Sequence, residues 1–240
     1  KERFSNASDF SVILIGNVNV DSIRPLLCDY LATLPSNGKK ENIRDNHTDI
    51  RPVDETHLFV RKQETSSTLV SIYYTGKTKY SALNDLKLDI LSQALRNVYT
   101  EKVREEQGGT YGVSVAGQLD RYPQAEMALK ISFRTAPDKY KQLIPIIYSE
   151  MEKISESGPS IECLNKIKKY LLKQYEENIR SNEYWDYVLY NELYTKTDFD
   201  NNYKQMVNQI SVQDIRDFAK ELLKQKRRIE VTMTSEEGTL

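Results

Sequence analysis

Apolar residues recur along this chain with two spacings, and each spacing predicts a different kind of element. Alternation of apolar and polar residues over short runs indicates strands. The strands predicted in this way span 10–16, 57–60, 67–74, 111–117, 126–133 and 229–233. Apolar residues three or four positions apart indicate helices. The predicted helices span 21–34, 80–103, 137–151, 160–175, 181–195 and 211–223.

Local signals at the ends of these segments support the helix predictions. Asp21 is expected to cap the first helix, and Pro35 is expected to end it. Ser211 followed three positions later by Asp214 resembles a capping box at the start of the last helix.

The order of the predicted elements indicates an α+β fold. Strands gather in hairpin-like pairs and helices follow in a block, which favours a mainly antiparallel sheet with helices packed on one face. The last strand, 229–233, has the same alternation as the opening one, so the chain holds parts of two similar units. We expect residues 1–36 to be the terminal strand and helix of a preceding repeat domain. Residues 37–53 then form a linker, and 54–240 a C-terminal repeat domain.

Composition narrows the classes of function. The 240 residues are 39% hydrophobic and 29% charged, with a formal net charge of −1, which gives no indication of nucleic-acid binding. No apolar run approaches the ~20 residues of a membrane span. The opening Lys1-Glu-Arg-Phe has neither an initiator Met nor a signal-peptide pattern, and is expected to be the interior of a longer protein.

The metal-ligating and nucleophilic residues form no familiar motif. Cys28 and Cys163 lie in separate predicted helices, and we expect both to be buried free thiols. His47 and His57 are ten positions apart across a polar segment, so neither HExxH nor HxxEH is present and no metal site is expected within this chain. Residues 112–117 have one residue too many for GxSxG, which argues against a serine nucleophile.

The stretch from Val103 to Val113 carries the most informative chemistry. It reads Val-Arg104-Glu-Glu-Gln-Gly108-Gly109-Thr-Tyr111-Gly-Val, a charged helix end that enters a Gly-Gly turn before a strand. Glycines permit the tight turn that would return Tyr111 toward Arg104. A guanidinium and a phenol are both donors suited to an oxygen that gains negative charge. The alternative is structural: the arginine caps its own helix and the tyrosine fills a core.

Three segments together resemble the pitrilysin-like (insulinase-like) zinc metallopeptidases, the group with the inverted HxxEH motif. Residues 10–21, Phe-Ser-Val-Ile-Leu-Ile-Gly-Asn-Val-Asn-Val-Asp, with Leu-Ala-Thr-Leu-Pro at 31–35, resemble the strand, turn and helix that end one repeat. Residues 104–111 resemble the family's Arg/Tyr element with its seven-residue separation. Gly-Pro-Ser-Ile-Glu at 158–162 and Lys-Ile-Lys-Lys-Tyr-Leu-Leu at 166–172 resemble the helix that follows.

This resemblance implies a fold and a division of labour. Family members have two halves, each of two similar α+β domains, which close around a peptide chamber with zinc in the first domain. By position, Arg104 and Tyr111 would contact the substrate backbone or the tetrahedral intermediate. Gly108 and Gly109 would be backbone hinges beside the bound peptide. The partners implied are the N-terminal half of the same protein and a peptide substrate.

One departure from the family pattern limits what the chain does alone. The helix segment 88–95, Leu-Asp-Ile-Leu-Ser-Gln-Ala-Leu, stands where the first domain would carry HxxEH, and it has no histidine. Zinc is therefore expected in the full-length protein but on another part of it. Two alternatives stay open: a catalytically inactive family member that serves as a scaffold or partner subunit, and a plain peptide-binding module. For a bacterial protein, both periplasm and cytoplasm are compatible with the sequence.

An aromatic stretch near the end of the chain allows two interpretations. It comprises Tyr184, Trp185, Tyr187, Tyr190 and Tyr194. These rings would either pack in the core and at its rim or line the wall of a peptide chamber.

Overall fold

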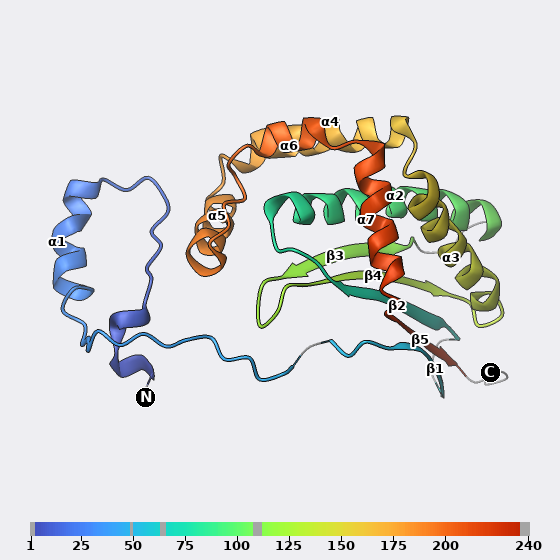
Figure 1. Ribbon diagram of the computed structural model, residues 1–240, viewed down its shortest axis with the longest axis horizontal. Coiled ribbons are helices and arrows are strands. Elements are labelled where there is room, and N and C mark those ends of the chain that lie inside the picture. The colour runs from blue at the N-terminus through green and yellow to red at the C-terminus, as the bar shows by residue number, and fades with distance from the viewer. Residues whose placement is uncertain (1–2, 49, 63–65, 108–111, 236–240) are drawn as a thin grey trace. The chain divides into compact units, whose positions relative to one another are not determined.

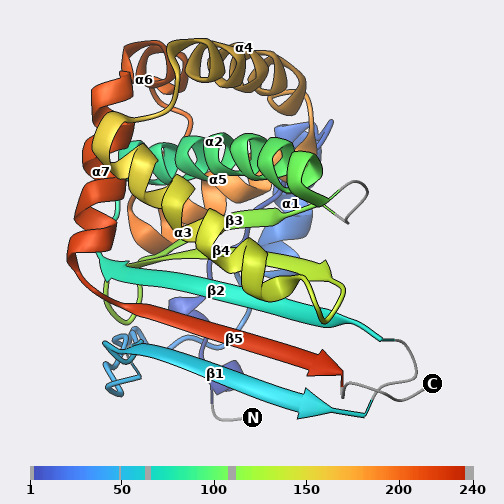
Figure 2. The same cartoon turned by 90° about the vertical axis from the view of Figure 1, so that its right-hand side faces the viewer.

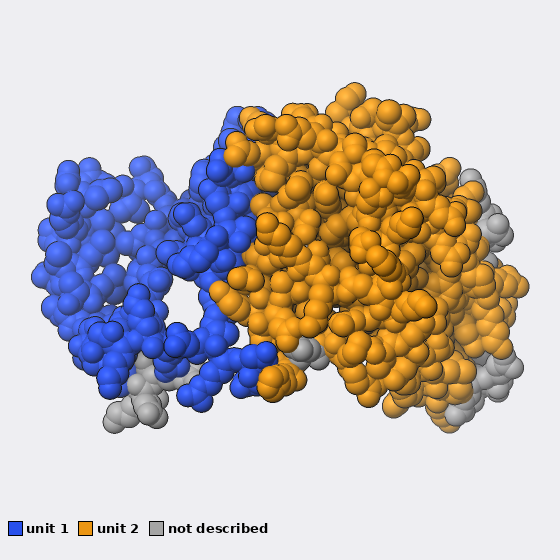
Figure 3. All heavy atoms as spheres, in the orientation of Figure 1, with its two compact units in different colours: residues 1–46, 173–201 blue, residues 47–172, 202–240 orange. Residues whose placement is uncertain are grey.

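Residues 3–48, 50–62, 66–107 and 112–235 are described by the computed structural model of the chain, residues 3 and 104–107 by their backbone alone. The chain divides into two compact units (Figure 3). One comprises residues 1–46 and 173–201, and the other comprises residues 47–172 and 202–240. The assignment of 1–36, 37–53 and 54–240 to a preceding domain, a linker and a C-terminal domain stays a prediction.

The larger unit is built on one five-stranded sheet in the order β1-β5-β2-β4-β3 (Figure 2). Only β1 and β5 pair in parallel, and the other three pairings are antiparallel. The prediction of a mainly antiparallel sheet is therefore confirmed. Arg228 at the start of β5 donates to Asp54 at the start of β1, at 2.9 Å from Nε to Oδ1. The strands are β1 (Asp54–Arg61), β2 (Thr68–Lys77), β3 (Ser114–Asp120), β4 (Glu126–Thr135) and β5 (Arg228–Ser235).

Three helices cover one face of this sheet, as the α+β prediction required (Figures 1 and 2). They are α2 (Ala82–Gln107), α3 (Tyr140–Ser157) and α7 (Val212–Lys224). Above them lie the first part of α4 (Ile161–Asn178) and the short α6 (Tyr203–Gln209), which the apolar spacing did not predict. Within the ranges described, no helix is long and apolar enough to cross a membrane. The buried core joins sheet and helices through residues such as Val70, Ile72, Leu129, Ile131, Leu91, Leu95, Ile147, Met151, Ile215 and Leu222.

Helix α2 lies unusually close to β3, because Gly117 has no side chain. A Cβ built at this position would lie 2.5 Å from Cγ of Leu88 and 2.9 Å from Oγ of Ser92, both on α2. One helical turn beyond Leu95, the fully buried Tyr99 donates its hydroxyl to the carbonyl of Ile147 in α3 at 3.0 Å. Glycine and tyrosine thus fix α2 against the sheet on one side and against α3 on the other.

The smaller unit contains short helical elements and no strand among its described residues. Its elements are the 3-10 turns η1 (Arg3–Ser5) and η2 (Ala7–Asp9), helix α1 (Val20–Tyr30), the end of α4 and helix α5 (Asn182–Thr195). The strand predicted over 10–16 is not formed. The alternation is present, but a strand needs a neighbour for its backbone hydrogen bonds, and nothing in the described part of the chain pairs with this segment.

The predicted helix ends are only partly correct. Asp21 does not cap α1; Asn19 does, because its Oδ1 accepts the amide hydrogen of Ser22 at 2.9 Å. Asp21 lies inside the first turn instead, where a carboxylate favours the helix dipole. The capping box at the start of α7 is confirmed, because Ser211 and Asp214 each bond the other's backbone.

Gly117→Ala is expected to destabilise the larger unit by about 1–3 kcal/mol, because the new methyl group would overpack the α2–β3 contact. Urea unfolding followed by far-UV circular dichroism measures the change. Gly112→Ala is the matched control, since no atom lies within 4 Å of a Cβ built there. Equal stability of the two variants would contradict the close-packing argument.

Candidate functional site

The predicted Arg/Tyr site lies at the junction between α2 and β3. The backbone of Arg104 belongs to the last turn of α2, which ends at Gln107. Gly108, Gly109 and Tyr111 lie outside the described residues, and so does the side chain of Arg104. The proximity of Arg104 to Tyr111 therefore stays a prediction.

Buried valines fix both ends of the segment that holds this site. Val103 comes immediately before Arg104 and is 2% exposed, and Val113 comes two residues after Tyr111 and is 4% exposed. Both belong to the core of the larger unit. Moving either end of the segment would expose a core side chain, which costs roughly 1.5–3 kcal/mol.

A second contact ties α2 to the strand that follows the site. The guanidinium of Arg96, two turns before Arg104, donates to the carbonyl oxygen of Val115 in β3 at 2.6 Å. Charge-assisted hydrogen bonds of this kind are stronger than those between neutral groups. Together with the close contact at Gly117, this bond sets the separation between α2 and β3, the two elements that the candidate loop connects.

Two carboxylates, those of Asp85 and Asp89, lie one turn apart near the start of α2. Burial, and then the charge of Asp89, raises the pKa of Asp85 from its ordinary value of 3.8 to about 6. The side chain of Asp89 accepts a hydrogen bond from Gln93 at 3.0 Å. Asp85 therefore takes up a proton as the pH falls toward 6.

The described residues offer no zinc site. No group of three or more His, Cys, Asp or Glu side chains among them is arranged to hold a metal ion. Arg51 and Glu55 form an exposed ion pair at 2.9 Å, and the ring of His57 contacts the same carboxylate at 3.1 Å. Cys28 and Cys163 are both free thiols, but the expectation that they are buried is wrong, because Cys28 is exposed and Cys163 is partly exposed.

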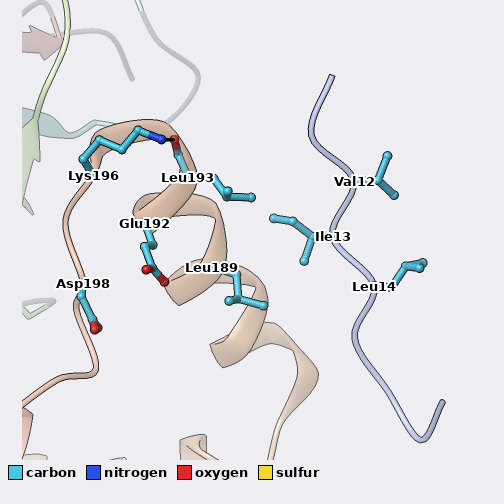
Figure 4. A pocket seen from close by; sticks show the side chains of 8 residues that line it. All are labelled: Val12, Ile13, Leu14, Leu189, Glu192, Leu193, Lys196 and Asp198. Carbon is cyan, nitrogen blue, oxygen red and sulfur yellow. Dashed lines mark hydrogen bonds between the residues drawn. The ribbon is translucent and has the colours of Figure 1, made fainter. Parts of the chain in front are cut away.

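A groove of about 560 Å³ lies within the smaller unit (Figure 4). Ile13 points toward helix α5, whereas Val12 and Leu14 point away from it. Leu189 and Leu193 of α5 supply the facing apolar surface. Charged groups stand at its end: Glu192, Asp198, and Lys196, whose ammonium donates to the carbonyl of Leu193 at 2.9 Å. The apolar alternation of 10–16 gave the side-chain directions here even though no strand forms.

Sequence reasoning missed the contacts that join residues far apart in the chain. The bond from Arg96 to Val115 and the close approach at Gly117 have no local signature beyond a glycine within an alternating strand, which often marks a close approach. In the smaller unit, Asp200 accepts hydrogen bonds from Tyr175 and Tyr184 at 2.8 and 2.7 Å. No spacing rule predicts that meeting.

Comparison with known proteins places the chain beside zinc proteases. The family described as "Peptidase M16 inactive domain" matches residues 1–171. The "Probable zinc protease PqqL" of Escherichia coli (strain K12) is 23% identical over 228 residues, which cover 93% of this chain and 24% of that protein. The "Zinc protease PQQL-like" of Arabidopsis thaliana is 21% identical over 196 residues, 76% of this chain and 20% of that protein. The chain thus spans about a quarter of the length of these relatives or less.

Solved structures agree on the fold. The crystal structure of the periplasmic protease PqqL from Escherichia coli superposes with a TM-score of 0.76 at 20% identity, over 92% of this chain and 25% of that chain. A protease from Helicobacter pylori superposes with a TM-score of 0.74 at 18% identity, over 92% of this chain and 53% of that chain. Matches at this level of identity establish a shared fold.

Asp85→Asn is expected to raise the free energy of unfolding at pH 7 by about 1–2 kcal/mol. The folded state holds the proton of Asp85 up to about pH 6, whereas the unfolded chain releases it near pH 4. This group therefore stabilises the fold increasingly as the pH falls from 7 to 4, and the variant should lack that contribution. Urea titrations at several pH values, with the exposed Glu156→Gln as control, measure it. Parallel pH profiles for wild type and Asp85→Asn would refute the interpretation.

Proposed function

Because the chain belongs to the peptidase M16 family, we propose that it forms a non-zinc-binding, substrate-enclosing C-terminal portion of a zinc metalloendopeptidase. The observation that carries this proposal is a combination: the inactive-domain match over residues 1–171, and the absence of histidine from segment 88–95 of α2. The zinc site would then lie on a part of the protein outside this chain. When bound there, zinc would polarise the scissile carbonyl and activate water.

The role of this chain in the reaction is to supply hydrogen-bond donors from the junction of α2 and β3. Arg104 and Tyr111 would contact the peptide backbone or the oxyanion of the tetrahedral intermediate. The buried Val103 and Val113 would hold the ends of the segment, and Gly108 and Gly109 would let its backbone approach the peptide. Preorganised donors are effective because they need no reorganisation when the charge develops.

The segment before the larger unit supports a further part of the proposal. No described residue between 4 and 46 is buried, and Phe10, Val12 and Leu14 are all about half exposed. We propose that residues 1–36 complete a preceding repeat domain, whose sheet would give 10–16 the strand partner that it lacks here. The N-terminal half of the same protein would then be the partner that closes around the peptide.

The alternative that family membership leaves open is an inactive subunit that acts as a scaffold. Sequencing the complete protein and measuring its zinc content would separate the two. An HxxEH motif with one bound zinc supports the peptidase, whereas a complete protein without the motif or the metal supports the scaffold.

In the complete protein, Tyr111→Phe and Arg104→Ala are each expected to lower kcat by about 10²–10³, with a smaller effect on KM, because each removes a donor that acts on developing charge. Steady-state hydrolysis of a quenched fluorescent peptide measures both parameters. Tyr170→Phe on α4 is the control, since this exposed tyrosine is remote in sequence from the site. An unchanged kcat in both site variants would rule out the catalytic contribution.

A further inference from the structure

Helix α5 presents a row of exposed tyrosines. Tyr187, Tyr190 and Tyr194 are 47%, 52% and 47% exposed, and their spacing of three and four residues places them on one side of the helix. The rings of Tyr190 and Tyr194 stack with centroids 5.5 Å apart and planes 26° apart. Tyr190 and Tyr194 therefore form a stacked, exposed aromatic pair.

This surface lies next to the side by which α5 is anchored. Val188, Asn191 and Thr195 are buried, and at 100° per residue they project about 100° away from the middle of the tyrosine row. The groove residues Leu189 and Leu193 occupy a third side. Tyr187 packs against the buried Phe199 with ring centroids 5.4 Å apart, whereas Tyr190 and Tyr194 stack on each other.

The anchored side of α5 is rigidly built. The Ser181 side chain caps the helix by accepting from the amide of Tyr184. Tyr184 and Tyr175 donate to the same oxygen of Asp200, and the indole of Trp185 donates to the carbonyl of Ile179 at 2.9 Å. Burial, with the hydrogen bond to Asp200, raises the pKa of Tyr175 to about 12, so it remains a donor at neutral pH. A helix held in this way presents its exposed rings with little conformational entropy to lose on binding.

The charge around the tyrosine row is strongly negative. Glu183 lies one turn before Tyr187, and Asp186 lies one turn before Tyr190, and both carboxylates are exposed. Residues 182–200 contain five acidic residues and a single basic one, Lys196. A surface of tyrosine rings bordered by carboxylates is complementary to guanidinium and ammonium groups, which stack on aromatic faces and pair with carboxylates.

We propose that this tyrosine face, defined by Glu183, Asp186, Tyr187, Tyr190 and Tyr194, binds a basic, arginine- or lysine-bearing stretch of polypeptide. Arginine side chains stack on the rings of Tyr190 and Tyr194, and their charge is met by Glu183 and Asp186. A two-fold contact of this face with the same face of a second copy would bring carboxylates against carboxylates. The proposal goes beyond the peptidase role, since it involves neither Arg104 nor Tyr111 and holds for the chain by itself.

Fluorescence anisotropy with the whole 240-residue chain tests this proposal. The probe is a dye-labelled peptide of alternating arginine and serine, and the comparison peptide carries glutamate in place of arginine. The wild-type chain should bind the arginine peptide and not the glutamate peptide. The double variant Tyr190→Ala/Tyr194→Ala should weaken binding about fivefold to thirtyfold, as expected for two exposed cation–π contacts.

Two further variants separate ring stacking from general charge attraction. Tyr170→Ala removes a tyrosine of equal exposure (51%) from α4, and should leave the affinity unchanged. Glu183→Gln/Asp186→Asn should weaken binding and make it less sensitive to salt. Equal affinity for the two peptides, or wild-type affinity in the Tyr190→Ala/Tyr194→Ala variant with an unchanged circular dichroism spectrum, would overturn the proposal. So would a concentration-dependent dimer in sedimentation that this variant abolishes.

Discussion

The close contact between α2 and β3 is the constraint on which the candidate site depends. It requires a glycine at 117, because Leu88 and Ser92 occupy the space of any side chain there. Arg96 closes the same interface from the helix side through the carbonyl of Val115. Since the core is packed as densely as a crystal, the two ends of the intervening segment have little freedom to shift. The buried Val103 and Val113 therefore stay in place at the two ends of the segment.

The sequence was informative where local pattern and tertiary packing agree. Alternation and helical spacing located the five strands of the larger unit and its long helices, and Ser211 marked a helix start correctly. The prediction of a strand over 10–16 was wrong because a strand forms only beside a neighbouring strand. No local sequence pattern indicates whether such a neighbour is present. Of the candidate site, the periodicity placed Arg104 at a helix end. The bond from Arg96 to Val115, nineteen residues apart, was beyond any local rule.

Helix α5 shows why the sequence alone does not reveal which aromatic residues are buried and which are exposed. Aromatic residues occur on several sides of it, so apolar spacing could not separate a buried side from an exposed one. Tyr184 and Tyr187 are the same residue type three positions apart. Asp200 accepts the hydroxyl of Tyr184, which makes that tyrosine part of the anchor, whereas Tyr187 lies 47% exposed. The hydrogen bond to Asp200 thus distinguishes the anchored Tyr184 from the exposed Tyr187. The predicted packing role is therefore seen for Tyr184, whereas the chamber-wall role of the exposed tyrosines stays a prediction.

The position of β5 has a consequence for how the chain folds. This strand is the last in sequence, yet it lies between β1 and β2 and pairs with both. On a ribosome that adds about 5–20 residues per second, β2 would wait roughly 8–30 s for residues 228–235 to emerge. During that time the early strands expose unpaired edges, and Leu58, Phe59 and Val60 stay about half exposed even in the finished sheet. The central pairing of the sheet therefore forms only after residues 228–235 have been made.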